Sequence, residues 1–163
     1  MLEDEPERRR LRLALTLPDE AAFFRTPEAT ASWSRMYLSL ARQAPDHFFV
    51  LQDDQDSQVI DTLAMQGLDV HPDQVRSFGD VDVWEQHLEN RDLVIGARIH
   101  GSMMAHYAGV PALLVAVDMR QLEFARAMHF PHVDRTDPGV QELVASVDFD
   151  IPAFLSLPQL RFN

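Results

Sequence analysis

The chain contains no cysteine among its 163 residues, which excludes disulfides, thiolate metal sites and a cysteine nucleophile. It also lacks lysine, since all 14 basic residues are arginine. The 26 acidic residues give a net charge of −12, which argues against general nucleic-acid binding because that function needs a basic face. Small anions remain compatible with this charge, because a local pocket of arginines can hold a carboxylate or a phosphate.

Long apolar runs are missing as well. No run approaches the roughly 20 residues of a membrane-spanning helix, so the sequence predicts no membrane span. The first ten residues are charged where a signal peptide has its apolar stretch, and we expect a cytoplasmic protein. Residues 1–10 are expected to form a flexible lead-in and residues 11–163 one domain, since the chain is too short for two ordinary ones.

Several common site motifs are also absent. There is no glycine-rich dinucleotide or Walker-type loop and no nucleophile elbow. His129 and His132 lack a carboxylate at a fixed spacing. The acidic run 53–56 lacks the glycine and glutamate of a calcium loop, so it reads as a solvated turn and a helix start. The sequence therefore predicts neither a metal site nor a cofactor.

Apolar runs and helical periodicity alternate along the chain. The predicted strands cover residues 11–17, 47–52, part of 70–78, the run from 93, 112–118 and 132–134. The predicted helices cover residues 27–42, 56–66, 82–90, 103–109, 120–128 and 139–146. This alternation predicts an α/β fold: a single Rossmann-like domain with a mostly parallel sheet, helices on both faces and right-handed crossovers.

The most informative stretch is the run DLVIGARIHGS at residues 92–102. In it an apolar strand ends in Arg98, His100 and Gly101, close to the expected start of a helix. The loop after a parallel strand and the first N–H groups of the next helix together form an anion site at the edge of a sheet. Arg98 adds a charged fork, and His100 adds a group able to move a proton near neutral pH.

Each of these residues also has a purely structural interpretation. Arg98 could be a surface cation paired with Asp92 or Asp118, and His100 could be held at the helix start by backbone hydrogen bonds. Asp118 follows the next strand, where it could orient a ligand or cap a helix. Gly101 and the serine after it would allow close approach of a phosphate, although both residue types are common at helix starts.

Taken together, DLVIGARIHGSMMA and the following AGVPALLVAVD resemble the carboxyl-terminal half of the polysaccharide pyruvyl transferase family. The matching block runs from about residue 92 to residue 123. The resemblance implies one Rossmann-like half of a B-type glycosyltransferase fold, in cell-surface or exopolysaccharide biosynthesis. It implies transfer of a pyruvyl group from phosphoenolpyruvate, the donor substrate, to a sugar as a ketal. The implied catalytic residues are His100 and Arg98, and the implied substrate-binding residues are Arg98, Ile99, Gly101, Ser102 and Asp118.

The chain departs from that family pattern in two ways. Only the second half is represented, so the glycan acceptor would need a partner half-domain or a homo-oligomer. In addition, the first strand runs into Pro18 and Asp19 rather than a basic residue, and Arg25 is the nearest later candidate. Two alternatives therefore stand beside the pyruvyl transferase interpretation: the nucleotide-sugar-binding half of a glycosyltransferase, and a non-catalytic binding module.

Overall fold

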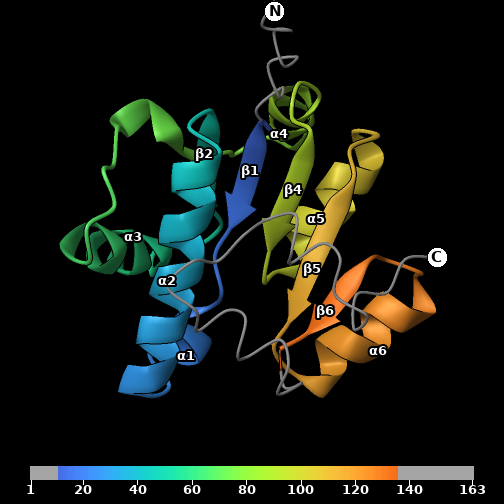
Figure 1. The fold of residues 1–163 in the computed structure, drawn as a ribbon. Helices are drawn as coiled ribbons and strands as arrows, with labels where there is room; N and C mark the ends of the chain where they lie inside the picture. The colour runs from blue at the N-terminus through green and yellow to red at the C-terminus, as the bar shows by residue number, and fades with distance from the viewer. Residues whose placement is uncertain (1–10, 136–163) are drawn as a thin grey trace, which may run out of the picture.

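A computed structural model describes residues 11–135 of the chain. Its strands are β1 (Leu13–Thr16), β2 (His47–Leu51), β3 (Val75–Ser77), β4 (Leu93–Gly96), β5 (Ala112–Ala116) and β6 (His132–Asp134). Its helices are α1 (Glu20–Phe23), α2 (Pro27–Gln43), α3 (Asp56–Met65), the 3₁₀ turn η1 (Pro72–Gln74), α4 (Val81–Leu88), α5 (Ile99–Tyr107) and α6 (Met119–Ala127). Strands and helices alternate along most of this range (Figure 1).

The six described strands form one sheet in the order β3-β2-β1-β4-β5-β6, and every neighbouring pair is parallel. The strand order reverses between β1 and β4. Ligands of open α/β sheets bind outside the carboxyl ends of the strands at such a reversal. The predicted α/β fold with a parallel sheet is therefore confirmed, and its topology draws attention to the loops that follow β1 and β4.

Helices cover both faces of this sheet (Figure 1). On one face, α2 and α3 pack on alternate residues of the central strands, with Trp33, Tyr37 and Leu63 fully or almost fully buried. On the other face, α4 and α5 pack against the remaining strand residues, and α6 packs beside α5. Burial on both faces explains why the central strands read as continuous apolar runs.

Ion pairs join the strands at the amino edge of the sheet. The backbone N–H of Arg12, just before β1, donates to the Asp92 carboxylate at 2.8 Å, and the Arg12 side chain also contacts that carboxylate. Arg91 donates to Asp46 at 2.8 Å, just before β2. The amino edge is thus closed by side-chain contacts between the starts of three neighbouring strands.

The structure differs from the sequence-based expectation in a few places. The short helix α1 and the turn η1 were not predicted, because neither is long enough to show a helical period. Helix α5 begins at Ile99 rather than at residue 103. The predicted helix 139–146 and the lead-in 1–10 lie outside the described residues. Within residues 11–135, none of the helices has the length and apolarity needed to cross a membrane.

Candidate functional site at the carboxyl edge of the sheet

Arg98 lies between β4 and α5, and its guanidinium is held by two carboxylates from the other side of β1. It donates to Asp56 Oδ1 at 2.7 Å and lies 3.0 Å from Asp53 Oδ2. Its side chain is only 14% exposed. The predicted pairing with Asp92 or Asp118 is wrong, because Asp92 lies at the amino edge with Arg12 and Asp118 caps a different helix.

Asp56 is the buried member of this cluster. Its side chain is 0% exposed, and its second oxygen accepts the backbone N–H of Gln52 at 2.7 Å. Burial raises the pKa of this carboxyl, while the Gln52 N–H and Arg98 act in the opposite direction. The expected helix start is confirmed, but the expected solvated character is wrong for Asp56, which is enclosed under Arg98.

His100 and Ile99 occupy the first turn of α5. His100 is exposed and contributes to the wall of a cavity of about 210 Å³ beside the ends of β2 and β3. Ile99 packs with the cluster that joins α5 to α6. Arg98 precedes α5 and makes no side-chain hydrogen bond to its first turn. The structure therefore directs His100 toward the cavity and Ile99 toward the protein interior.

Gly101 and Ser102 are both buried in α5. A side chain at Gly101 would collide with the methyl group of Thr16, at the end of β1. Gly96, at the end of β4, is under the same constraint, since a side chain there would meet both the hydroxyl and the carbonyl of Thr16. These two glycines let β1, β4 and α5 approach one another closely at the point where the strand order reverses.

Asp118 caps α6, which is one of the two roles that the sequence suggests for it. Its carboxylate accepts the backbone N–H of Gln121 at 2.8 Å. The Gln121 side chain in turn accepts the N–H of Val117 and donates to the carbonyl of Ala97, both at 2.9 Å. This network joins the loops after β4 and β5. Asp118 itself remains exposed and reaches the wall of a second, larger cavity.

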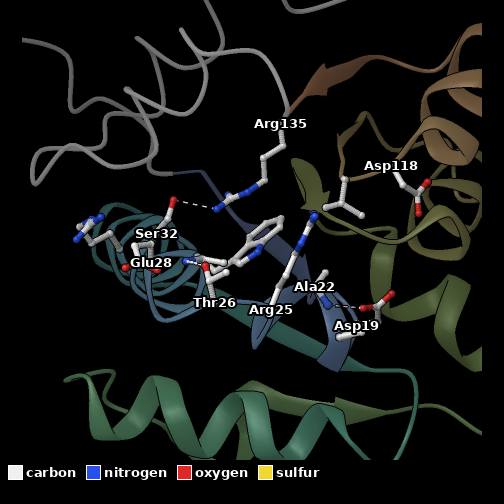
Figure 2. A pocket seen from close by; sticks show the side chains of 13 residues that line it. Asp19, Ala22, Arg25, Thr26, Glu28, Ser32, Asp118 and Arg135 are labelled. Atoms are coloured by element: carbon white, nitrogen blue, oxygen red, sulfur yellow. Dashed lines mark hydrogen bonds between the residues drawn. The ribbon is translucent and has the colours of Figure 1, made fainter.

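That larger cavity has a volume of about 790 Å³. It lies beside α1 and α2 and the ends of β5 and β6, and polar side chains from distant parts of the sequence meet in it (Figure 2). The guanidinium groups of Arg25 and Arg135 both point into it, with Trp33 forming part of the wall. Sequence reasoning noted Arg25 only as the nearest basic residue after the first strand, and it did not single out Arg135.

Arg135 is held in place by aromatic and polar contacts. Its guanidinium carbon lies 3.6 Å from the centre of the Trp33 ring, a cation–π geometry. One of its nitrogens donates to the Ser32 hydroxyl at 2.8 Å. Burial lowers its pKa to about 10, whereas Arg25 is exposed. The cavity therefore combines a fixed cation in its wall with a second cation accessible to solvent.

The described residues contain no group of three or more histidine or acidic side chains placed to hold a metal ion. The two cavities lie on different parts of the carboxyl edge. Their lining residues do not overlap: the small one is lined from β2, β3, α4 and α5, and the large one from α1, α2 and the ends of β5 and β6.

Fold and site together define a single α/β domain with an all-parallel, Rossmann-type sheet and cavities at its carboxyl edge. No protein-family model and no curated protein matches the chain. The solved structures similar to it include the glycotransferase of kitacinnamycin, with 17% identity, a TM-score of 0.40, and coverage of 94% of this chain and 38% of that one. They also include the glycosyltransferase SnogD from Streptomyces nogalater, with 22% identity, a TM-score of 0.38, and coverage of 91% and 41%.

The chain thus spans about two-fifths of the length of each of these glycosyltransferases.

Proposed function

We propose that this chain is the donor-binding half of a transferase that acts on sugars and that it holds a phosphorylated donor at the carboxyl edge of its sheet. The observation that carries the proposal is the pair of guanidinium groups, from Arg25 and Arg135, that point into the 790 Å³ cavity. Arginine binds phosphate through a planar fork of N–H donors. Arg25 forms no hydrogen bond or ion pair within the described residues, so it is available to a ligand.

The donor favoured by the sequence is phosphoenolpyruvate. The run from Arg98 to Ser102 supports this choice, because it is the part of the chain that resembles the pyruvyl transferases. In that reaction two hydroxyls of a sugar form bonds to the central carbon of the pyruvyl group, and its bond to the phosphate oxygen breaks. One hydroxyl proton reaches the methylene carbon, which becomes a methyl group, and the other leaves with inorganic phosphate.

In this proposal His100 and Arg98 have different roles in the pyruvyl transfer, although the sequence alone predicts both as catalytic. His100 is exposed and is of a residue type that moves protons, but it lines the small cavity rather than the one that holds the donor in this proposal, so its part in proton transfer stays a prediction from the resemblance. Arg98 is engaged by Asp53 and Asp56, so its role in this proposal is to fix the loop that carries His100. Contact of Ile99, Gly101, Ser102 and Asp118 with substrate remains a prediction.

A nucleotide sugar is the second candidate donor, and the volume of the large cavity favours it. About 790 Å³ falls in the range of roughly 300–1,000 Å³ that is typical of ligand sites. Phosphoenolpyruvate is much smaller than a nucleotide sugar and would fill only part of this space. In this alternative the two arginines hold the diphosphate, and the reaction transfers a glycosyl group.

Calorimetric titration with phosphoenolpyruvate and with a uridine diphosphate sugar tests the proposal. The Arg25→Ala variant should weaken binding of the true donor about tenfold or more, because a charged hydrogen bond is lost. Arg126→Ala is the matched control, since it removes an exposed arginine on α6 that does not line the cavity. Binding of neither donor, or equal binding by the two variants, would refute the assignment of this cavity and favour a non-catalytic module.

A partner half-domain, or a second copy of this chain, would supply the glycan acceptor site in either version. Mixing the chain with a candidate partner half should then release phosphate or nucleotide in the presence of a glycan, whereas the isolated chain should bind its donor without turnover. Turnover by the isolated chain would remove the need for a partner.

A further inference from the structure

The side chain of Gln121 joins two loops at the carboxyl edge beyond the point where the sheet itself connects them. The ladder between β4 and β5 ends at the pair of Gly96 and Leu114. Beyond that pair, the Gln121 side chain accepts the backbone N–H of Val117 and donates to the carbonyl of Ala97, both at 2.9 Å. One side-chain amide thus connects the two chain segments in the way that a backbone peptide group does in a ladder.

These two bonds explain why the residue at this position is a glutamine. Gln121 is the third residue of α6, and Asp118 is the cap of that helix. In a capping box the side chain at this position reaches back to the N–H of the cap residue, and glutamate serves there as well as glutamine. Gln121 instead accepts from the residue before the cap and donates to Ala97, 24 residues away. An ionised glutamate has no donor for that carbonyl.

The stretch that Gln121 holds is part of the wall of the large cavity. Val117 and Asp118 line that cavity together with Arg25 and Arg135. The Asp118 carboxylate accepts the backbone N–H of Gln121 at 2.8 Å, so both of these wall residues are bonded to Gln121. Gln121 itself is only 5% exposed and lines neither cavity. Any effect of its side chain on a ligand therefore passes through the wall.

We propose that Gln121 is a positioning residue for the large cavity. It fixes the wall formed by Val117 and Asp118 to the loop after β4, and it thereby sets the shape of the cavity before a ligand binds. Without its two side-chain bonds the wall would have to be ordered on binding, which weakens affinity. The effect on donor binding rests on the proposed function, whereas the position of the wall does not.

Residual dipolar couplings, measured by nuclear magnetic resonance, test the position of the wall without a ligand because they report the orientation of each backbone N–H. Gln121→Met removes both side-chain bonds and keeps the approximate size of the side chain. The couplings of Val117 and Asp118 should change in this variant, while those of β5 stay the same. Asp80→Ala is the matched control, because it also loses two hydrogen bonds, at the start of α4, and lines neither cavity. It should leave all of these couplings unchanged.

Calorimetric titration of the same variants tests the consequence for donor binding. Phosphoenolpyruvate and a uridine diphosphate sugar are the probes, at a temperature where every variant is folded. Gln121→Met should bind about threefold to tenfold more weakly than the unmodified chain, and Asp80→Ala should bind as the unmodified chain does. A side chain that only stabilised the fold would lower the unfolding temperature in both variants and leave the affinity of both unchanged.

Hydrogen exchange in the unmodified chain adds a measurement that does not depend on whether a variant folds. The side-chain amide protons of Gln121 should exchange at least about tenfold more slowly than those of Gln58, which is exposed on α3.

Three results would overturn the inference. The first is exchange of the Gln121 side-chain protons at the rate of Gln58. The second is an unchanged set of couplings at Val117 and Asp118 in Gln121→Met. The third is equal donor binding by Gln121→Met and the unmodified chain. If the unmodified chain binds neither probe, the proposed function fails, and the couplings and the exchange rates alone decide whether Gln121 positions the wall.

Discussion

Arg98 donates to Asp56 Oδ1 at 2.7 Å, and this bond connects the loop after β4 to the start of α3. In the sheet, β1 lies between β2 and β4, so the bond passes over the end of β1 where the strand order reverses. Arg98, which the sequence offers as a ligand-binding group, thus pairs with two carboxylates of the same chain.

Removal of the Arg98 side chain should therefore destabilise the fold. Arg98→Ala leaves the Asp56 carboxylate buried without its cation, and we expect a loss of about 3 kcal/mol in the free energy of unfolding. Asp53→Asn should cost less than about 1 kcal/mol, because the Asp53 side chain is 42% exposed and asparagine keeps an acceptor for the N–H groups of Gln55 and Asp56. Urea denaturation of the two variants measures both values. Equal, small losses would mean that the buried contact contributes little.

Tyr37 should resist ionisation until the protein unfolds. Its hydroxyl donates to the carbonyl of Thr16 at 2.6 Å, and burial raises the pKa of the phenol above its usual value of 10.0. Above that pH the unfolded chain releases the proton while the folded chain retains it, so stability should fall as the pH rises. In Tyr107→Phe, Tyr37 is the only tyrosine, and tyrosinate absorbance should appear only together with unfolding. A tyrosinate signal from the folded variant near pH 10 would contradict this expectation.

The close approach of α5 to β1 predicts a specific rescue. Gly101→Ala places a methyl group against the Thr16 methyl group, which should cost about 1–3 kcal/mol as overpacking. Thr16→Ser removes that methyl group, so the double variant should recover part of the loss. Gly96→Ala should not be rescued in this way, because its side chain would also meet the Thr16 hydroxyl and carbonyl. Thermal denaturation of Gly101→Ala and Gly96→Ala, each with and without Thr16→Ser, and of Thr16→Ser alone measures whether each loss of stability is rescued.

Substitutions of Asp118 separate capping from ligand binding. Asp118→Ala removes the acceptor for the Gln121 N–H and should cost about 1 kcal/mol of stability, whereas Asp118→Asn should keep most of the cap because asparagine is an equally good capping residue. If the negative charge also orients a donor, Asp118→Asn should weaken donor binding at nearly unchanged stability. Equal donor binding by Asp118→Asn and the unmodified chain would limit the residue to its structural role.

The regular part of the fold could be predicted from the sequence because its signals are local. Helix α2 has Trp33, Met36 and Leu40 at helical spacing, and all three are buried as that period requires. The central strands are short apolar runs bounded by charged or turn residues. Local patterns of this kind fix the type and order of elements, and the alternation of strand and helix then defines a parallel sheet.

The candidate site depended on relationships that no local pattern contains. Asp56 is 42 residues from Arg98, and Ser32 is 103 residues from Arg135. From the sequence, the candidate partners of Arg98 are Asp92, just before its own strand, and Asp118, just after the next strand. The sequence indicates a helix start near His100 but not the first residue of α5, Ile99, because Arg98 does not cap the helix through its side chain. Tyr107 lies three residues after the buried Met104, a spacing typical of one helix face, yet it is 67% exposed.

The two edges of the sheet differ, because ion pairs lie at the amino edge and the cavities lie at the carboxyl edge. Both cavities lie at the carboxyl edge, while Arg91 and Asp46 close the opposite end. Glu89 is exposed in the turn near that closed end. Since the chain has no cysteine of its own, Glu89→Cys would introduce its only thiol. A surface coupled there would hold every molecule in one orientation, with both cavities facing the solution.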